Sequence, residues 1–313
     1  MNSPAISIVA PVYNSRECLE ELARHVKDVC SANNISWELI LVNDCSTDDS
    51  WSIIRKLCSS SSSIRGLNLR RNFGQDNAIM AGIHCASGLY VVIMDDDLQH
   101  DPADIPSLLE EIRRGYDVVY ATYRRKRQRL WKNIGSWFNG KVATILLRKP
   151  EAVYLSPYKI LTSDIATEIG RYDGPYPYID GLLFRSTCRY SEVPVKHADR
   201  FKGRTTYTLL KSIKVWTRLV TTFSVFPLRL ATVIGFVTAI SGIALGFYFM
   251  LIRLTQPDIP IGWASTTVSV LVLSGIQLFA IGVVGEYIGR AYLNLNRHPQ
   301  YAVGEAVGID KPQ

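Results

Sequence analysis

Three successive aspartates, Asp95, Asp96 and Asp97, follow an uninterrupted apolar run at residues 90–94. Such a run predicts a buried strand, and the ligands of α/β sheets bind where strands end. In an extended segment Asp95 and Asp97 point to one side and Asp96 to the other. Two carboxylates on one side repel each other unless a cation lies between them, and a hard divalent ion that bridges phosphate oxygens is the usual partner. The alternative is a solvated acidic turn that caps the next helix.

Polar residues also follow three other expected strands. Residues at neighbouring strand ends line one crevice and can contact a single ligand. There Tyr13 can stack on a nucleotide base, Asp44 can accept a hydrogen bond from a ring N–H, and backbone amides near Gly74 can face phosphates. The other candidate residues in these segments are Pro11, Asn14 and Arg71. Taken singly, each residue also fits ordinary turn or cap chemistry.

The segments that position these residues alternate between short apolar runs and helical patterns up to residue 122. This order predicts an α/β fold with an open, doubly wound, mostly parallel sheet. A dinucleotide-binding dehydrogenase is excluded because no GxGxxG follows the first strand. The expected strands are residues 6–12, 38–42, 64–69, 90–94 and 118–120, and the expected helices are residues 16–30, 48–58, 76–86 and 105–114.

Two stretches without any charge, residues 230–252 and 264–285, lie in the carboxyl-terminal part of the chain. Each is long enough to cross the roughly 30 Å apolar core of a bilayer as a helix. Their length disfavours the alternative, a pair of buried core helices. The loop between them carries one basic residue, whereas both flanking regions are far more basic. The positive-inside rule therefore predicts a multi-pass protein of the inner, cytoplasmic membrane, with the large N-terminal part and both termini in the cytoplasm.

Residues 124–148 contain eight basic residues and no acidic one, so the formal net charge of +7 is concentrated there. Apolar residues of this segment recur at spacings of three and four, which predicts a helix lying in the membrane interface. An amphipathic helix packed on the sheet is the alternative. A second basic, apolar segment at residues 207–226 leads into the first span. With two spans on the same chain, an anionic lipid surface is a better partner for these residues than nucleic acid.

In combination these residues resemble the family 2 inverting glycosyltransferases, specifically the polyprenyl-phosphate branch related to dolichyl-phosphate mannose synthase, of the bacterial undecaprenyl-phosphate type. The resemblance covers nearly the whole chain. In the first half, PxYN looks like residues 11–14, VDDxSxD is similar to residues 42–48 with Asn43 in place of the first Asp, RNxGxxxAxxxG resembles residues 71–82, and DxDLQxxP matches residues 95–102. Further on, RxxGxSKY resembles residues 200–207 and GEYxGRxY corresponds to residues 285–292. The absence of QxxRW argues against processive polysaccharide synthases.

The resemblance implies a glycosyltransferase A-type nucleotide-sugar fold and roles for the matching residues of its donor site. Tyr13 and Asp44 would hold the nucleotide base. Asp95 and Asp97 would hold Mg²⁺ or Mn²⁺ on the donor diphosphate. The residues further implied in nucleotide-sugar binding are Pro11, Asn14, Arg71, Gly74, Asp96 and Gln99.

For the acceptor, the resemblance implies that Arg200 meets a phosphate, either that of the lipid or that of the donor. The sequence departs from the family pattern here, because Thr205 and Thr206 replace Ser-Lys and remove one positive charge. Lys202 or Arg204 would compensate for that loss. Similar proteins form tetramers through their membrane segments, so the resemblance also implies a homo-oligomer.

These features predict a membrane-bound, inverting, metal-dependent transferase that moves one sugar, a hexose, from a nucleotide sugar to polyprenyl phosphate on the cytoplasmic leaflet. A lipid monophosphate needs no base for attack, since its second pKa is about 6 and it is largely ionised near pH 7. Asp180, in YPYIDGLLF, is a candidate base or sugar contact, although Asp-Gly is also common in turns. We assign sugar selection to loops such as residues 156–178.

Two other functions remain open at the level of sequence. The first is transfer to the hydroxyl of a lipid-linked saccharide or glycerolipid, which would make Asp180 essential as a base. The second is a non-catalytic membrane adaptor on the same fold, which has no need for an intact pair of metal-binding carboxylates.

The expected domain organisation has four parts. They are a nucleotide-sugar-binding core at residues 1–123, an acceptor-side part of the catalytic domain with interface helices at residues 124–227, a two-span membrane domain at residues 228–290, and a cytoplasmic tail at residues 291–313.

Overall fold

The computed structural model describes residues 3–123, 155–195, 226–255, 262–295 and 299–309. The chain divides into two compact units. The first, an α/β unit, comprises residues 1–206 and 297–313, and the second, a helical unit, comprises residues 207–296. Each unit is described by itself below.

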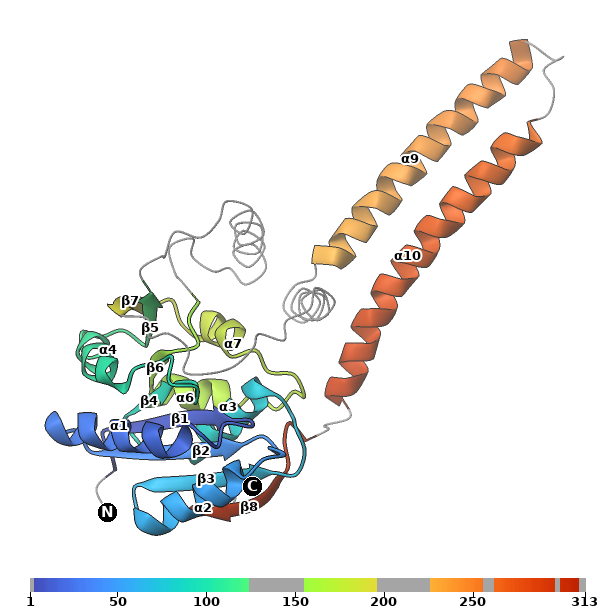
Figure 1. Cartoon of the computed structure of the whole chain (residues 1–313). Helices are drawn as coiled ribbons and strands as arrows, with labels where there is room; N and C mark the ends of the chain where they lie inside the picture. The colour runs from blue at the N-terminus through green and yellow to red at the C-terminus, as the bar shows by residue number, and fades with distance from the viewer. Residues whose placement is uncertain (1–2, 124–154, 196–225, 256–261, 296–298, 310–313) are drawn as a thin grey trace. The chain divides into compact units, whose positions relative to one another are not determined.

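One eight-stranded sheet forms the centre of the α/β unit, in the order β7-β5-β6-β4-β1-β2-β3-β8 (Figure 1). The pairs β1–β2, β1–β4, β2–β3 and β5–β7 are parallel, whereas β6 and β8 run antiparallel to their neighbours. The strands are β1 (Ile6–Val12), β2 (Trp37–Asn43), β3 (Ile64–Leu69), β4 (Tyr90–Ile93), β5 (Val118–Tyr123), β6 (Lys159–Thr162), β7 (Tyr190–Val195) and β8 (Val303–Val307).

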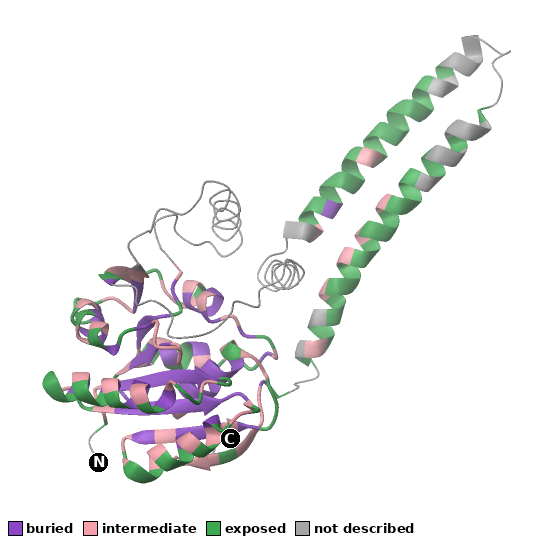
Figure 2. Cartoon of the chain, in the orientation of Figure 1, coloured by how far each residue is buried: buried purple, intermediate pink, exposed green. Residues whose placement is uncertain are grey.

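Helices cover both faces of the sheet, because its central strands are apolar on both sides. In β1, Ile6, Ile8 and Ala10 pack with α1, α2 and α4, whereas Val9 packs with α3, α6 and α7. This alternation follows from the two-residue period of a strand. The resulting buried layer is purple in Figure 2. The helices are α1 (Leu19–Ala32), α2 (Ser50–Ser60), α3 (Gln75–Cys85), α4 (Ile105–Ile112), α6 (Ser163–Gly170) and α7 (Ile179–Ser186), with a 3₁₀ turn at Pro102–Asp104. The expected doubly wound, mostly parallel sheet is confirmed.

Three strands, β6, β7 and β8, were not expected from the sequence. Residues 156–178, expected to be loop, contain β6 and α6. Because β6 lies between β4 and β5, strands from both sides of residue 123 belong to one sheet. Residues 303–307, expected to belong to a cytoplasmic tail, form β8 on the outer edge of β3. Both β6 and β8 are too short to show periodicity in the sequence, and they are ordered by pairing with neighbouring strands.

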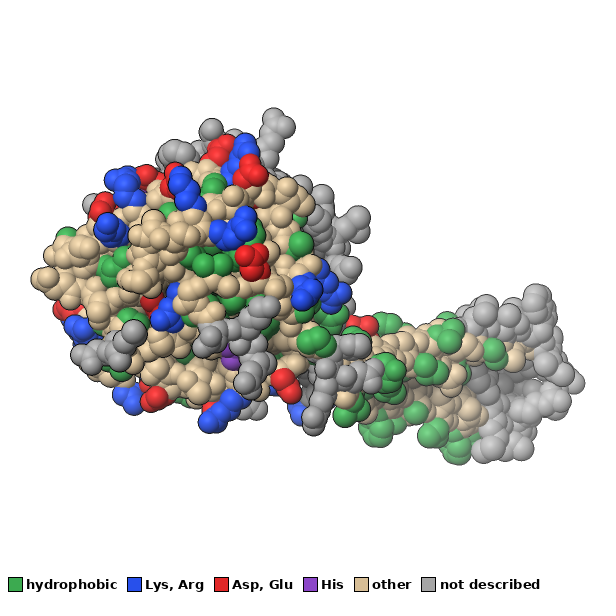
Figure 3. Space-filling model, turned by 90° about the horizontal axis from the view of Figure 1, so that it is seen from below, with side chains coloured by type: hydrophobic (Ala, Val, Ile, Leu, Met, Phe, Trp, Pro, Cys, Tyr) green, Lys and Arg blue, Asp and Glu red, His purple; other side chains and the backbone are tan. Residues whose placement is uncertain are grey.

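The helical unit is a hairpin of α9 (Phe226–Thr255) and α10 (Trp263–Leu295). Within it, Leu228–Tyr248 and Val272–Leu293 are long and apolar enough to cross a membrane. Their apolar side chains are exposed, as Ile243 (75%) and Leu278 (70%) illustrate. Figure 3 shows hydrophobic side chains over these helices and mixed charges over the α/β unit. The exposed apolar surface supports association with a membrane. Of the predicted interface segments, residues 124–148 lie outside the described residues, and so does the segment 207–226 except for Phe226, the first residue of α9.

Candidate active site

The loops after β1 and β2 are joined by Asn14. Its backbone N–H donates to Ser46 Oγ at 3.0 Å, and its Oδ1 accepts from Thr47 N at 2.8 Å. The left-handed φ of 54° at Asn14 turns the chain sharply after β1, a conformation that asparagine tolerates. Pro11 is buried inside β1, opposite Val42. Asn14 and Pro11 therefore position Tyr13, whose side chain is 51% exposed at the carboxyl edge of the sheet.

Asp44 fixes the glycine loop that precedes α3. Its two carboxylate oxygens accept the backbone N–H groups of Phe73 and Gly74, at 2.7 and 2.8 Å. Burial raises the pKa of Asp44, and these two hydrogen bonds oppose the shift. The amides near Gly74, expected to face phosphates, therefore face a protein carboxylate instead, because a buried carboxylate requires donors. Arg71, from the same loop, lies over the Phe73 ring with its guanidinium carbon 4.6 Å from the centroid.

The three aspartates lie in the loop that follows β4. The first of them, Asp95, is two residues beyond Ile93, the last residue of the strand. Asp96 receives a hydrogen bond from the Ser15 side chain, after β1, while Asp97 Oδ1 accepts from Gln99 N at 3.2 Å. Asp95 is held by α3, since Gln75 Nε2 donates to Asp95 Oδ1 at 2.8 Å. Asp95 and Asp96 are thus held by different neighbouring elements.

His100 holds the backbone of Asp95 through a hydrogen bond. Its Nδ1 accepts the backbone N–H of Asp95 at 2.9 Å, and its Nε2 lies 3.8 Å from Asp95 Oδ2. The imidazole is buried and stacks on Tyr158, with ring centroids 5.1 Å apart. Because Nδ1 is an acceptor, a neutral ring carries its proton on Nε2, the nitrogen nearer the carboxylate. His100 therefore fixes the loop that carries the carboxylates.

The electrostatics of this loop fit a divalent cation. Burial and repulsion from Asp97 raise the pKa of Asp95 to about 7, and burial raises that of Asp96 to about 6. Among the described residues, Asp96 Oδ2 is buried without a hydrogen-bond partner. No group of three or more His, Cys, Asp or Glu within that part of the chain has the geometry of a metal site. Two hard carboxylate ligands fit an ion that takes its remaining ligands from substrate phosphates and water, as Mg²⁺ does.

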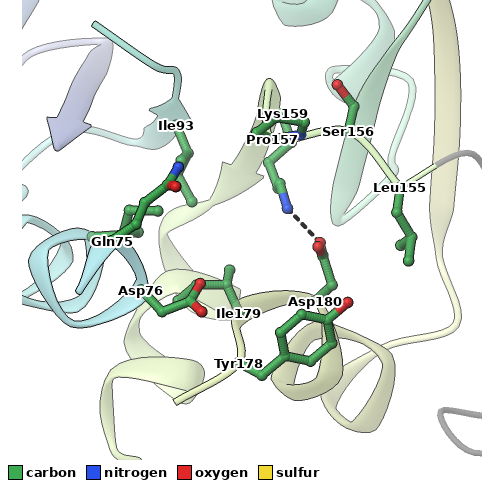
Figure 4. A pocket seen from close by; sticks show the side chains of 11 residues that line it. Gln75, Asp76, Ile93, Leu155, Ser156, Pro157, Lys159, Tyr178, Ile179 and Asp180 are labelled. Atoms are coloured by element: carbon green, nitrogen blue, oxygen red, sulfur yellow. Dashed lines mark hydrogen bonds and ion pairs between the residues drawn. The ribbon is translucent and has the colours of Figure 1, made fainter. Parts of the chain in front are cut away.

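A pocket of about 300 Å³ lies beside Asp95, between α3, β6 and α7 (Figure 4). Gln75 lines it and also donates to Asp95, so the pocket adjoins the carboxylate loop. Its other polar lining residues are Asp76, Ser156, Lys159, Tyr178 and Asp180, and its apolar lining residues are Ile79, Ile93, Leu155, Pro157 and Ile179.

A buried ion pair forms one wall of this pocket. Lys159 Nζ donates to Asp180 Oδ1, and the Tyr120 hydroxyl donates to the same oxygen at 3.1 Å. The side chains of Lys159 and Asp180 are 4% and 15% exposed. Asp180 lies in the first turn of α7, where a carboxylate is favoured by the helix dipole. The Asp-Gly pair is therefore helical here, and not a turn.

The structure brings most of the predicted site residues to one edge of the sheet. The loops after β1, β2, β3 and β4 carry Tyr13, Asn14, Asp44, Arg71, Gly74 and the three aspartates with Gln99. Asp180 is joined to this edge through the pocket. Arg200, Lys202 and Arg204 lie outside the described residues, so their assignment to a lipid phosphate stays a prediction.

Four residues at the site were missed in the sequence: Gln75, Asp76, His100 and Lys159. Lys159 had a readable signal, because it is a charged residue directly before the apolar pair Ile160 and Leu161. Such a charge in a strand requires a buried partner. Gln75 and His100 had none, since their contacts with Asp95 depend on how α3 and the following loop pack.

Comparison with known proteins agrees with this geometry. The model of glycosyl transferase family 2 matches residues 7–166, and that of the GtrB C-terminal hairpin matches residues 226–291. The undecaprenyl-phosphate 4-deoxy-4-formamido-L-arabinose transferase of Edwardsiella ictaluri is 33% identical, with 98% of this chain and 95% of that protein covered. An uncharacterized glycosyltransferase of Bacillus subtilis is 31% identical, with 97% and 94% covered.

Among solved structures, the fold is similar to glucosyl-3-phosphoglycerate synthase from Mycobacterium tuberculosis in complex with Mn²⁺, uridine diphosphate and glucosyl-3-phosphoglycerate. The TM-score is 0.52 at 18% identity, with 70% of this chain and 78% of that chain covered. At this identity the likeness concerns the fold alone. The full-length relatives and the two matched models carry the assignment further: this chain belongs to glycosyltransferase family 2, with the membrane hairpin of its GtrB-like members at the carboxyl-terminal end.

Proposed function

We propose that this protein transfers a single sugar from a nucleotide-sugar donor to undecaprenyl phosphate, with inversion at the anomeric carbon. The observation that carries the proposal is the Asp95–Asp97 loop, which Gln75 and His100 hold beside a pocket lined by both polar and apolar residues. The acceptor is supported by full-length relatives named as undecaprenyl-phosphate transferases. Those names specify a pentose derivative, so they give no support to the expected hexose.

The proposed donor site uses residues at the carboxyl edge of the sheet. Tyr13 is exposed and free to stack on the base. Each Asp44 oxygen accepts one backbone N–H and keeps a second lone pair for a ring N–H of the base. Asp95 and Asp97 would hold Mg²⁺ or Mn²⁺, which when bound supplies positive charge to the departing diphosphate.

The chemical step is a back-side displacement. An oxygen of the lipid phosphate forms a bond to the anomeric carbon, and the bond from that carbon to the diphosphate oxygen breaks with its electron pair staying on the nucleotide diphosphate. The acceptor oxygen is already ionised near pH 7, because the second pKa of a phosphate monoester is about 6. The protein therefore supplies alignment and charge stabilisation in place of a base.

The environment of Asp180 favours this acceptor over a lipid hydroxyl. A hydroxyl needs a general base, and Asp180 is the candidate at the pocket. Its Oδ1 is already occupied by Lys159 and Tyr120. Both lone pairs of that oxygen are therefore used by donors from the pocket wall. We therefore propose that Asp180 shapes the pocket wall and does not act as a general base.

The proposed location is the cytoplasmic face of the inner membrane. It is supported by the two apolar helices and by the basic residues flanking them. This orientation brings nucleotide sugars, which are cytoplasmic metabolites, to the α/β unit. Assembly as a tetramer remains a prediction carried over from similar proteins.

The test is a transfer assay with the detergent-purified, full-length protein, Mn²⁺, undecaprenyl phosphate and a panel of radiolabelled nucleotide sugars. We expect label from one donor to enter the organic phase, and none when undecaprenol replaces its phosphate. The variant Asp97→Asn should lose at least about 100-fold in rate, typical of removing a group that stabilises the transition state. The control Asp28→Asn changes an exposed aspartate on α1 and should retain full activity. Full activity of Asp97→Asn would contradict the metal site, and transfer to undecaprenol would contradict the proposed acceptor.

A further inference from the structure

The pocket beside Asp95 has an uneven charge balance. Two carboxylates, Asp76 and Asp180, line it, but Lys159 is its only cationic lining residue among those described. Lys159 forms an ion pair with Asp180. Its positive charge therefore mainly neutralises Asp180, and not Asp76. Burial and the nearby Asp180 raise the pKa of Asp76 to about 6, which leaves it ionised at pH 8. The pocket wall therefore carries a net negative charge.

The pocket adjoins the carboxylates proposed to hold the donor diphosphate, so its position suits the donor sugar. Gln75 is shared, because it lines the pocket and donates to Asp95 Oδ1. A diphosphate held at Asp95 and Asp97 would place the group attached to it at the mouth of this pocket. In a nucleotide sugar, that group is the sugar ring. In Figure 4 the carboxylate of Asp180 points toward Lys159, and Asp76 lies on the opposite wall near Gln75.

The lining chemistry fits a sugar ring. Asp76 accepts the backbone N–H of Ile179 and keeps acceptor capacity for a hydroxyl or amide donor of a ligand. The Tyr178 phenol stays protonated because burial, Asp180 and Asp76 raise its pKa. The apolar residues of the opposite walls can cover the C–H faces of a ring. The acceptor phosphate is a poor occupant, because a dianion would face Asp76 and the already paired Asp180.

We propose that this pocket binds the donor sugar and that Asp76, together with the Lys159–Asp180 pair, selects sugars without a carboxylate over uronic acids. The inference rests on the proposed function and extends it to the class of donor. Neutral and amino sugars present hydroxyl, amide or ammonium donors to Asp76. A uronate places another carboxylate against a negative wall in a partly desolvated site, where like charges repel strongly.

The test compares donors that differ only in this carboxylate. Dissociation constants are measured by calorimetry at pH 8 for the full-length protein in detergent with Mn²⁺, using UDP-glucose against UDP-glucuronate and GDP-mannose against GDP-mannuronate. The nucleotide contributes equally within each pair, so the ratio reports on the sugar pocket. We expect the neutral member of the accepted pair to bind at least about tenfold more tightly, equivalent to about 1.4 kcal/mol.

Asp76→Asn should abolish most of this preference by improving uronate binding. Asp76→Ser, which removes the charge and suits a helix start, provides a second variant if the first is poorly folded. The matched control is Asp164→Asn, because Asp164 is an exposed aspartate in the first turn of α6. It should keep the wild-type ratio.

The outcomes separate the inference from the function on which it rests. Equal binding of both members of a pair by the wild type, or an unchanged ratio in both Asp76 variants, would overturn the assignment of the pocket while transfer to undecaprenyl phosphate stands. Failure of all four donors to bind, with no transfer in the assay described above, would overturn the proposed function and this inference together.

Discussion

At the scale of single residues, the site depends on groups that hold the carboxylates as much as on the carboxylates themselves. Asp95 has neighbours on two sides, Gln75 from α3 and His100 from its own loop. Supporting hydrogen bonds of this kind orient metal ligands and fix their protonation state. Metal affinity should therefore depend on Gln75, although an uncharged amide so placed is not expected to be a ligand itself.

The corresponding prediction concerns Gln75→Leu. Leucine keeps the volume but removes the donor to Asp95 Oδ1, a bond to a charged group worth about 1.5–3 kcal/mol. We expect the Mn²⁺ concentration for half-maximal transfer to rise about 10-fold or more, in line with losses seen for supporting residues. The rate at saturating Mn²⁺ should fall less. An unchanged Mn²⁺ requirement, measured by titrating the metal in the transfer assay, would contradict the positioning role.

At the scale of elements, the start of α3 sets the geometry of the site. Gly74 is the residue before this helix and has φ 93° and ψ 157°, a region that is essentially restricted to glycine. Added side-chain atoms would meet nothing within 4 Å, so the requirement is one of backbone conformation alone. This backbone directs the Phe73 and Gly74 amides to Asp44 and Gln75 toward Asp95.

We predict that Gly74→Ala lowers stability by about 1–3 kcal/mol, the strain of a non-glycine residue in this region. It should also weaken nucleotide binding, because the loop that Asp44 holds would shift. Gly170→Ala is the matched control, since its added carbon would make only ordinary contacts, the nearest at 3.5 Å from His84. Thermal unfolding and nucleotide titration of both variants check this. Equal effects of the two substitutions would show that Gly74 has no special conformational role.

The last strand, β8, protects the edge of the sheet. It pairs with β3, and Glu305 accepts a hydrogen bond from Trp51 Nε1 at 2.8 Å. Just before this strand, the hydroxyl group of Tyr301 forms a hydrogen bond with His84 Nδ1, at 2.6 Å. An unpaired β3 would expose a row of backbone donors and acceptors, which promotes aggregation.

A chain ending at residue 299 should therefore be less stable and aggregate more than one ending at residue 309, which keeps β8. Size-exclusion chromatography in detergent and thermal unfolding measure both properties. Identical behaviour of the two truncated proteins would mean that β8 contributes nothing to the sheet.

At the scale of the whole molecule, one chain joins a unit suited to water, the α/β unit, to a unit suited to lipid, the helical hairpin. The α/β unit buries its apolar residues, whereas the helical hairpin exposes them. In water that exposed surface would be unfavourable, at about 25 cal/mol per Å² of apolar area. A bilayer removes this penalty, so the hairpin is the part that determines where the enzyme resides.

A charge in the middle of α9 should reduce membrane retention. Ile243→Arg lies within Leu228–Tyr248, and an arginine at a helix centre costs about 2.5–3.5 kcal/mol on insertion. The control is Leu89→Arg, because Leu89 is also an exposed apolar residue (60%) but belongs to the α/β unit. The protein remaining in membranes after alkaline washing should fall for the first variant only. Equal retention of both variants would argue against insertion of α9.

The sequence by itself determined the α/β core, the apolar hairpin and the family. Long apolar runs and motif spacing are local properties, so β1 and β3 were predicted with the bounds observed. Tertiary structure alone decided the rest. It placed β6 and β8 in the sheet, turned the Phe73 and Gly74 amides to Asp44, and brought Asp76, Lys159 and Asp180 into one pocket beside Asp95. These contacts join residues that are far apart in the chain. Short strands and single polar residues carry no periodic signal in the sequence, because only the neighbours that pack against them fix their positions.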